Sequence, residues 1–151
     1  MKLWAVAVAV AAFGSALSGC GGAAASLGQQ VSTWGRDSGF MAALATIRSD
    51  LARLAVASPT SSALVRTECD VLVTDSLAAH QQLPTPDAML TSLLGNAYAS
   101  AGSSGSDCFS AASGHLGVLE RSATERAQAV TWLIKAEARF DALIATVPTS
   151  P

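Results

Sequence analysis

Apolar residues recur along this chain at alternating spacings of four and three, which is the rhythm of one face of an α-helix. The clearest stripe consists of Phe40, Leu44, Ile47, Leu51 and Leu54. Residues three and four apart lie on the same side of a helix, so the stripe predicts a helix that buries one face. No segment alternates between apolar and polar residues over enough length to form a strand. The fold is therefore predicted to be all-α.

Proline-containing turns divide this pattern into about four helices. Ser58-Pro59 ends the first helix and starts a second, which ends near Leu83. In the turn at 83–87, Thr85 is expected to cap the third helix, with Pro86 at its first position. The second and third helices carry apolar stripes of their own: Val65, Cys69, Leu72 and Ala79, then Leu90, Leu93, Leu94, Ala97 and Tyr98.

The fourth helix is predicted to be long, from about His115 to Thr146. Its apolar face is wide and contains Leu119, Ala123, Val130, Leu133, Phe140, Leu143 and Val147. Short connections between amphipathic helices favour antiparallel neighbours, so we expect an up-down bundle of four helices.

The N-terminus has the features of an export signal. Lys2 is the one charged residue before Arg36, and the apolar run 3–13 that follows it is too short to span a membrane. Behind this run, Leu17-Ser18-Gly19-Cys20 resembles the lipobox of bacterial lipoprotein precursors. The resemblance implies cleavage between Gly19 and Cys20, which removes residues 1–19 as a signal peptide. A plain secreted protein with an incidental cysteine is the alternative.

A lipobox implies a lipid anchor on Cys20, with palmitate-like chains that hold the protein on the extracytoplasmic face of the cell membrane. Two or three chains make such an anchor stable. Residues 20–30 are small and polar, which is typical of a flexible tether. The helical domain is then expected over residues 31–151, which is long enough to bury a core.

The other two cysteines are expected to form a disulfide. With Cys20 assigned to lipid, Cys69 and Cys108 remain, and exported proteins meet an oxidising environment. A loop of this size would stabilise the fold by about 4 kcal/mol. Two buried free thiols are the alternative. Straight antiparallel helices would leave these cysteines out of step along the bundle, so the third helix is predicted to break at Gly102–Ser106.

Few side chains are suited to chemistry. The chain has a net charge of −2 and 13% charged residues, which argues against nucleic acid as a partner. His80 and His115, the two histidines, are too isolated for a metal site or a catalytic triad and are expected at the surface. Asp70 and Asp75 are expected on one solvated helix face with Glu68. No nucleophile elbow, phosphate-binding loop or zinc-protease motif occurs, and no metal or cofactor is predicted.

Several motifs occur along the chain after Cys20: Trp34-Gly35-Arg36-Asp37, Cys69 with Asp75, the turn Pro84-Thr85-Pro86-Asp87, and Cys108 ahead of a final long helix. Together they resemble small, Ala-rich actinobacterial lipoproteins of unknown function. The resemblance covers most of the chain after Cys20. It implies a helical envelope protein and carries no established activity.

Three functions remain open. The first is a non-catalytic envelope lipoprotein whose helical surface binds another envelope protein or the cell wall, with Trp34 as a possible partner contact. The second is a module that holds a lipid or another small apolar ligand in a cavity between helices. An enzyme is the third, and it would need a cleft that gathers at least two ionisable side chains.

Overall fold

The computed structural model describes residues 24–56 and 63–147, and within these ranges all its regular structure is helical, with no strand. Five α-helices follow one another, with a 3₁₀ turn at Leu116–Val118 before the last. Their bounds are α1 Leu27–Asp37, α2 Phe40–Val56, α3 Ala63–His80, α4 Ala88–Ala112 and α5 Leu119–Ile144. The predicted all-α fold is confirmed. The predicted turn at Ser58-Pro59 lies outside the described residues.

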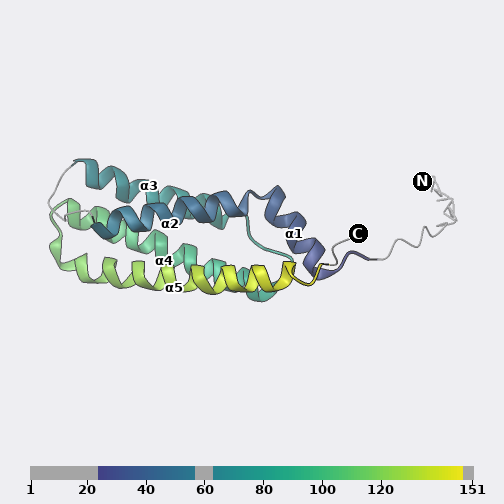
Figure 1. The fold of residues 1–151 in the computed structure, drawn as a ribbon. Helices are drawn as coiled ribbons and strands as arrows, with labels where there is room; N and C mark the ends of the chain where they lie inside the picture. The colour runs from purple at the N-terminus through teal and green to yellow at the C-terminus, as the bar shows by residue number, and fades with distance from the viewer. Residues whose placement is uncertain (1–23, 57–62, 148–151) are drawn as a thin grey trace, which may run out of the picture.

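Four of these helices form an elongated up-down bundle, and the fifth closes one end of it. Figure 1 shows α2, α3, α4 and α5 side by side along a common axis. The short helix α1 is inclined to that axis and lies at the end of the bundle where α5 finishes.

The apolar stripes lie in the core, as predicted for the first three stripes. Every member of the stripe from Phe40 to Leu54 is buried, and Leu72, Leu90 and Leu94 are completely enclosed. The predicted apolar face of the last helix is wrong for the first half of α5, where Ala123 and Val130 are exposed. That half buries Ser122 and Ala129 instead. The hydrogen bonds between Ser104 and Ser122 bring α5 close to α4 at this point.

Helix α1 is an element that the periodicity did not predict. It begins at Leu27, inside the stretch expected to be a flexible tether, and not at residue 31 or later. Ser26 and Gln29 form a capping box that satisfies the backbone at its start. Gly28 brings the helix against α5, since a Cβ there would lie 2.5 Å from the carbonyl oxygen of Leu143.

The third long helix starts later than predicted, with Asp87 and not Thr85 as its N-cap. The Asp87 carboxylate accepts a hydrogen bond from the Leu90 N–H at 2.7 Å. It also binds the Arg139 guanidinium on α5 through contacts of 2.8 and 3.1 Å. Thr85 instead bonds to the backbone of Asp87, and to the hydroxyl of Thr91 at 3.0 Å. A carboxylate can cap the helix and bind the cation together, which a hydroxyl cannot.

The predicted break at Gly102–Ser106 is wrong, because α4 runs unbroken through these residues while Cys69 and Cys108 are bridged. Counted from the connection between α3 and α4, Cys108 lies about nine residues further along its helix than Cys69 lies along its own. This difference corresponds to roughly 13 Å of helix. The seven-residue connection 81–87 absorbs this offset. It runs past the end of α3 toward α1, so that α4 starts further along the bundle (Figure 1).

Close packing on two sides explains why this Gly/Ser segment stays helical. A Cβ on Gly105 would lie 2.8 Å from the Cys69 carbonyl oxygen on α3. On the opposite side, the hydroxyls of Ser104 and Ser122 each donate to the other residue's carbonyl oxygen at 2.9 Å. Tertiary packing thus overrides the low helix propensity of glycine and serine.

Candidate functional site

Trp34 lies where α1 meets the connection that follows α3. Its indole N–H donates to the Gln82 carbonyl oxygen at 3.2 Å. Its ring lies tilted against Phe40, with 5.4 Å between centroids, and Phe40 in turn contacts Phe140 at 4.9 Å. This aromatic chain and the hydrogen bond fix the indole, which is half-buried.

Beside this indole is an open cleft of about 980 Å³, which we call the Trp34 cleft. Polar, uncharged side chains dominate its lining: Gln29, Gln30, Thr33, Ser38, Gln81 and Gln82, together with Trp34, Asp37, Ala25 and Pro84. The Ser38 hydroxyl is buried and has no hydrogen-bond partner in the described part of the chain. The volume of the Trp34 cleft is in the range of sites for small molecules, and the lining of the cleft suits binding more than proton transfer.

Trp34 is the one residue of this lining that was predicted from the sequence as a partner contact. The glutamines were missed, although the signal was present as two Gln-Gln pairs, 29–30 at the start of α1 and 81–82 just after α3. Helix periodicity places residues within one element, but it does not say which helix ends meet.

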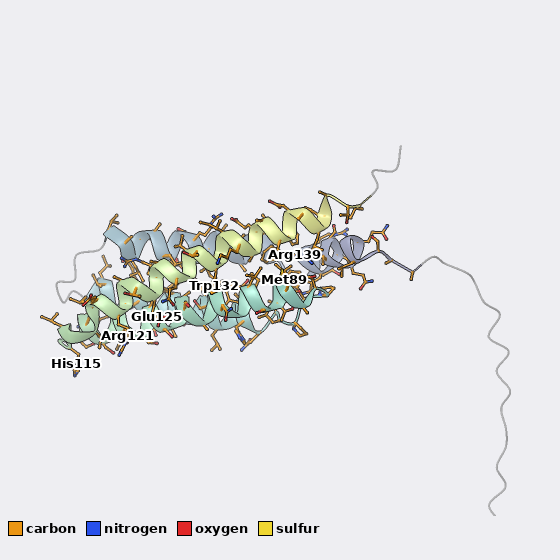
Figure 2. The ribbon with its side chains drawn as sticks, turned by 90° about the horizontal axis from the view of Figure 1, so that it is seen from below. Met89, His115, Arg121, Glu125, Trp132 and Arg139 are labelled. Carbon is orange, nitrogen blue, oxygen red and sulfur yellow. A yellow bond between two sulfur atoms is a disulfide. The ribbon has the colours of Figure 1, made fainter. Side chains whose placement is uncertain are left out.

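A second concavity, which we call the α4 groove, has a volume of about 650 Å³. Its floor contains small residues of α4, and its sides come from α3 and α5: Val73, Ser76, Leu77, His80, Tyr98, Ala99, Gly102, Ser103, Ser106, Asp107, Arg121 and Glu125. Figure 2 shows Arg121 and Glu125 near one end of α5, with Trp132 and Arg139 further along the helix.

Three ionisable groups that line the α4 groove, those of Asp107, Arg121 and Tyr98, have pKa values shifted further from neutral pH. Asp107 and Arg121 form a bidentate ion pair, with 2.6 Å between Oδ1 and Nη2. The guanidinium lowers the pKa of Asp107, and the carboxylate raises the pKa of Arg121. Burial raises the pKa of Tyr98 to about 12. A general acid or base works best with a pKa near the working pH, so these three groups are poorly suited to that role.

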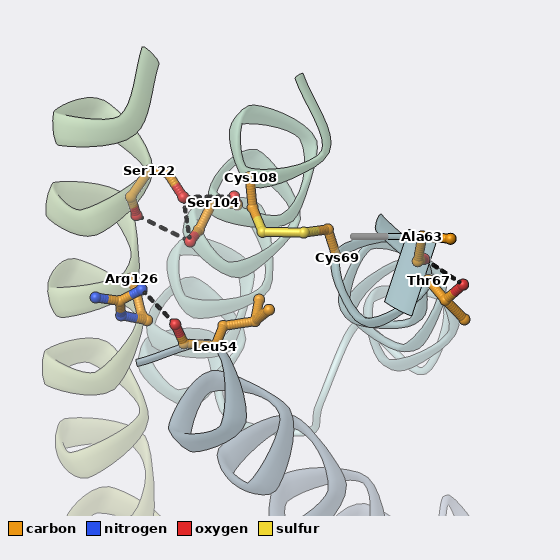
Figure 3. The surroundings of a disulfide bond; sticks show 8 residues. All are labelled: Leu54, Ala63, Thr67, Cys69, Ser104, Cys108, Ser122 and Arg126. Carbon is orange, nitrogen blue, oxygen red and sulfur yellow. Dashed lines mark hydrogen bonds between the residues drawn. A yellow bond between two sulfur atoms is a disulfide. The ribbon is translucent and has the colours of Figure 1, made fainter. Parts of the chain in front are cut away.

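The cysteine pair is bridged at the end of the bundle opposite α1. Cys69 on α3 and Cys108 on α4 have Cα atoms 5.7 Å apart, within the normal range for a disulfide. Figure 3 shows the bridge beside the Ser104–Ser122 contact and beside Arg126, which donates to the Leu54 carbonyl oxygen at 3.2 Å. An apolar cavity of about 170 Å³ adjoins it, which is smaller than typical ligand pockets.

Asp75 does not lie on the solvated helix face where it was expected. Asp70 is exposed, but Asp75 is half-buried and faces Asp50 of α2 instead of lying on a solvated face. Burial raises the pKa of Asp75, and the neighbouring Asp50 carboxyl raises it further. One oxygen of Asp50 binds Arg53, while the other is buried with no hydrogen-bond partner among the described residues.

The remaining predicted residues are separate from these sites or outside the described ranges. His80 lies at the rim of the α4 groove, and His115 is exposed beyond the end of α4. Gly19 and Cys20 lie outside the described residues. Within those residues no group of three or more His, Cys, Asp or Glu side chains could hold a metal ion. The described helices include none long and apolar enough to cross a membrane.

Comparison with known proteins found no matching family model, no matching curated protein and no matching solved structure.

Proposed function

We propose that this chain is a cell-envelope lipoprotein that acts as a non-catalytic binding module, anchored on the extracytoplasmic face of the membrane through a lipid on Cys20. The lipobox-like sequence 17–20 supports the anchor. The disulfide between the other two cysteines is compatible with an oxidising compartment.

The Trp34 cleft is the observation that carries the binding role. It combines a fixed aromatic ring with neutral amide and hydroxyl groups, and Asp37 is the one titratable side chain in its lining. Most small-molecule sites are lined mainly by apolar side chains with a few placed polar groups, and the Trp34 cleft has a larger share of polar side chains. Such a lining can orient a ligand but offers little for acid-base or nucleophilic chemistry.

The α4 groove is the feature that most favours an enzyme, because five ionisable side chains of the described residues line it. They are His80, Tyr98, Asp107, Arg121 and Glu125. Two of them neutralise each other in an ion pair that also joins α4 to α5. Binding therefore remains the better supported role.

Membrane fractionation with metabolic labelling tests the anchor. The full chain is expected in the membrane fraction, carrying an alkyne-labelled palmitate, whereas Cys20→Ser is expected to be unlabelled and released. Identical labelling and fractionation of the two proteins would contradict the proposed anchor.

A pull-down from envelope extract tests the binding role, with the lipidated chain as bait. The captured partner should be lost from a Gln81→Ala/Gln82→Ala bait and retained by Gln128→Ala, which changes an exposed glutamine on α5 away from the cleft. Equal capture by all three baits would mean that the Trp34 cleft does not bind the partner.

A further inference from the structure

Four of the five glutamines in this chain line the Trp34 cleft. Gln29 and Gln30 come from the first turn of α1, and Gln81 and Gln82 follow the last turn of α3. Two distant parts of the sequence thus present amide side chains to one cleft. An amide both donates and accepts hydrogen bonds, as a sugar hydroxyl does.

Most of this hydrogen-bonding capacity is available to a ligand. Gln29 uses its carbonyl oxygen to accept from the Ser26 N–H at 2.8 Å, and Gln30 uses its amide NH₂ to donate to the Ala25 carbonyl oxygen at 2.8 Å. The remaining half of each amide has no partner within residues 24–56 and 63–147, nor do the side-chain amides of Gln81 and Gln82.

The aromatic component of the cleft is held in place before any ligand arrives. The indole N–H of Trp34 donates to the Gln82 carbonyl oxygen, and the indole ring contacts Phe40. These two interactions restrain the Trp34 ring. A rigid aromatic ring provides apolar surface at low entropic cost, and the C–H faces of sugar rings are suited to stacking on such a surface.

The charge of the cleft selects against anions. Among the described residues, Asp37 is the one charged residue in its lining, and none of them contributes a lysine or an arginine. Phosphate and carboxylate ligands are normally recognised by arginine, lysine or a helix N-terminus. The N-terminus of α1 borders the cleft, but the capping box of Ser26 and Gln29 already uses backbone N–H groups there. A neutral ligand with many hydroxyl groups fits this lining better than a phosphorylated or acidic one.

From these observations we infer that the Trp34 cleft binds a neutral saccharide chain. The inference rests on the proposed function, because it names the ligand class of the same binding module. It concerns the ligand and not the anchor, so the two can be tested separately.

Calorimetric titration of the full chain in detergent tests the inference, with a β-1,4-linked N-acetylglucosamine tetramer and maltotetraose as probes. At least one sugar is expected to bind, with a Kd on the order of 0.1–1 mM, typical of an open, neutral site. Binding should shift the indole N–H resonance of Trp34 in an amide correlation spectrum and leave that of Trp132 unmoved.

Substitutions at the cleft should weaken this binding without unfolding the chain. Gln81→Ala/Gln82→Ala is expected to lower the affinity at least tenfold, since both side chains are exposed and the Trp34 hydrogen bond uses a backbone carbonyl. Trp34→Phe keeps an aromatic ring and should weaken binding several-fold. Gln128→Ala is the matched control and should bind as the unmodified chain does. Thermal melts followed by circular dichroism check the fold of each variant.

The two probes distinguish possible sources of the saccharide. Binding of the N-acetylglucosamine tetramer alone supports a wall-type glycan, and binding of maltotetraose alone supports a neutral glucan. Failure of both sugars, or equal weakening by Gln128→Ala, overturns the inference. If both sugars fail while the Cys20→Ser comparison succeeds, the saccharide inference falls and the proposed lipoprotein stands.

Discussion

Asp87 is the single residue on which the start of α4 depends most. Its carboxylate caps the helix through the Leu90 N–H and binds Arg139 on α5, so one side chain both begins a helix and joins it to another. Arg139 lowers the pKa of Asp87 against an opposing effect of burial. A folded-state pKa below the unfolded value adds stability above the unfolded pKa.

Replacement of Asp87 by Asn should therefore destabilise the chain in a pH-dependent way. Asn is also a good N-cap, so the substitution keeps the cap and removes the charge. We expect a loss of about 1 kcal/mol at pH 7, since hydrogen bonds to charged groups contribute more than neutral ones. The loss should fade as the pH falls through the folded pKa of Asp87. Urea unfolding of both proteins at pH 7 and at pH 2 measures it, and an equal loss at both values would contradict the account.

Removal of the charge of Asp75 should change stability in the direction opposite to removal of the charge of Asp87. Burial and the adjacent Asp50 raise the pKa of Asp75, so folding favours its protonated form. Stability from this group is present below the unfolded pKa and is lost as the pH rises through the folded pKa. Asp75→Asn, which is neutral at every pH, should raise the Tm at pH 7 and have less effect at pH 3. Asp70→Asn, on an exposed site of the same helix, is the control and should change the Tm little.

At the scale of helices, α4 is defined by what packs on each of its sides. Gly105 faces the backbone of α3, where a Cβ would lie 2.8 Å from an oxygen, while a Cβ on Gly102 would have its nearest neighbour at 3.8 Å. The two glycines stand one turn apart in the same helix. The two positions therefore form a matched pair. They have the same local helix propensity, but they differ in the space available between the helices.

Substitution of these two glycines by alanine should have opposite effects. Gly102→Ala should stabilise the chain by up to about 1 kcal/mol, because alanine favours the helix and space is available. Gly105→Ala should destabilise it by about 1–2 kcal/mol, because overpacking forces α3 and α4 apart. Chemical denaturation measures both changes. Stabilisation by both substitutions would show that the close approach at Gly105 does not constrain the helix.

The limits of prediction from the sequence are also clearest at this scale. The stripes from Phe40 to Leu54 and from Leu90 to Tyr98 were predicted correctly, because large apolar residues at helical spacing bury themselves in most contexts. Helix α1 and the packing face formed by Ser104 and Ser122 were not predicted. Small and polar residues carry a weak periodic signal, and their burial depends on how closely another helix approaches. The Trp34 cleft was missed for a related reason, since it forms where the ends of two helices meet.

For the molecule as a whole, the disulfide cross-links one pair of neighbouring helices. Cys69 and Cys108 are 39 residues apart, and the loop between them is the α3–α4 hairpin. The shared apolar core joins the helices without a covalent bond. Ion pairs and hydrogen bonds add to it, including those of Arg48 with Glu137 and of Arg126 with Leu54.

Removal of the bridge should destabilise the whole bundle without changing its helical fold. The double variant Cys69→Ala/Cys108→Ala is expected to lose about 4 kcal/mol of unfolding free energy, because the unfolded chain regains the entropy of a closed loop. Its far-ultraviolet circular dichroism should remain helical. Urea unfolding of the variant, beside the oxidised and reduced parent chain, measures the loss. A variant as stable as the oxidised parent would contradict this role.

The position of the bridge also affects the order in which the chain can assemble. Both cysteines precede α5, so a chain that enters an oxidising compartment with its N-terminus first delivers the complete α3–α4 hairpin before its last helix. The cross-link can close on this hairpin while α5 is still to arrive. Helix α5 then docks on a template whose two helices are already joined, with Ser104 and Asp87 in place to receive Ser122 and Arg139.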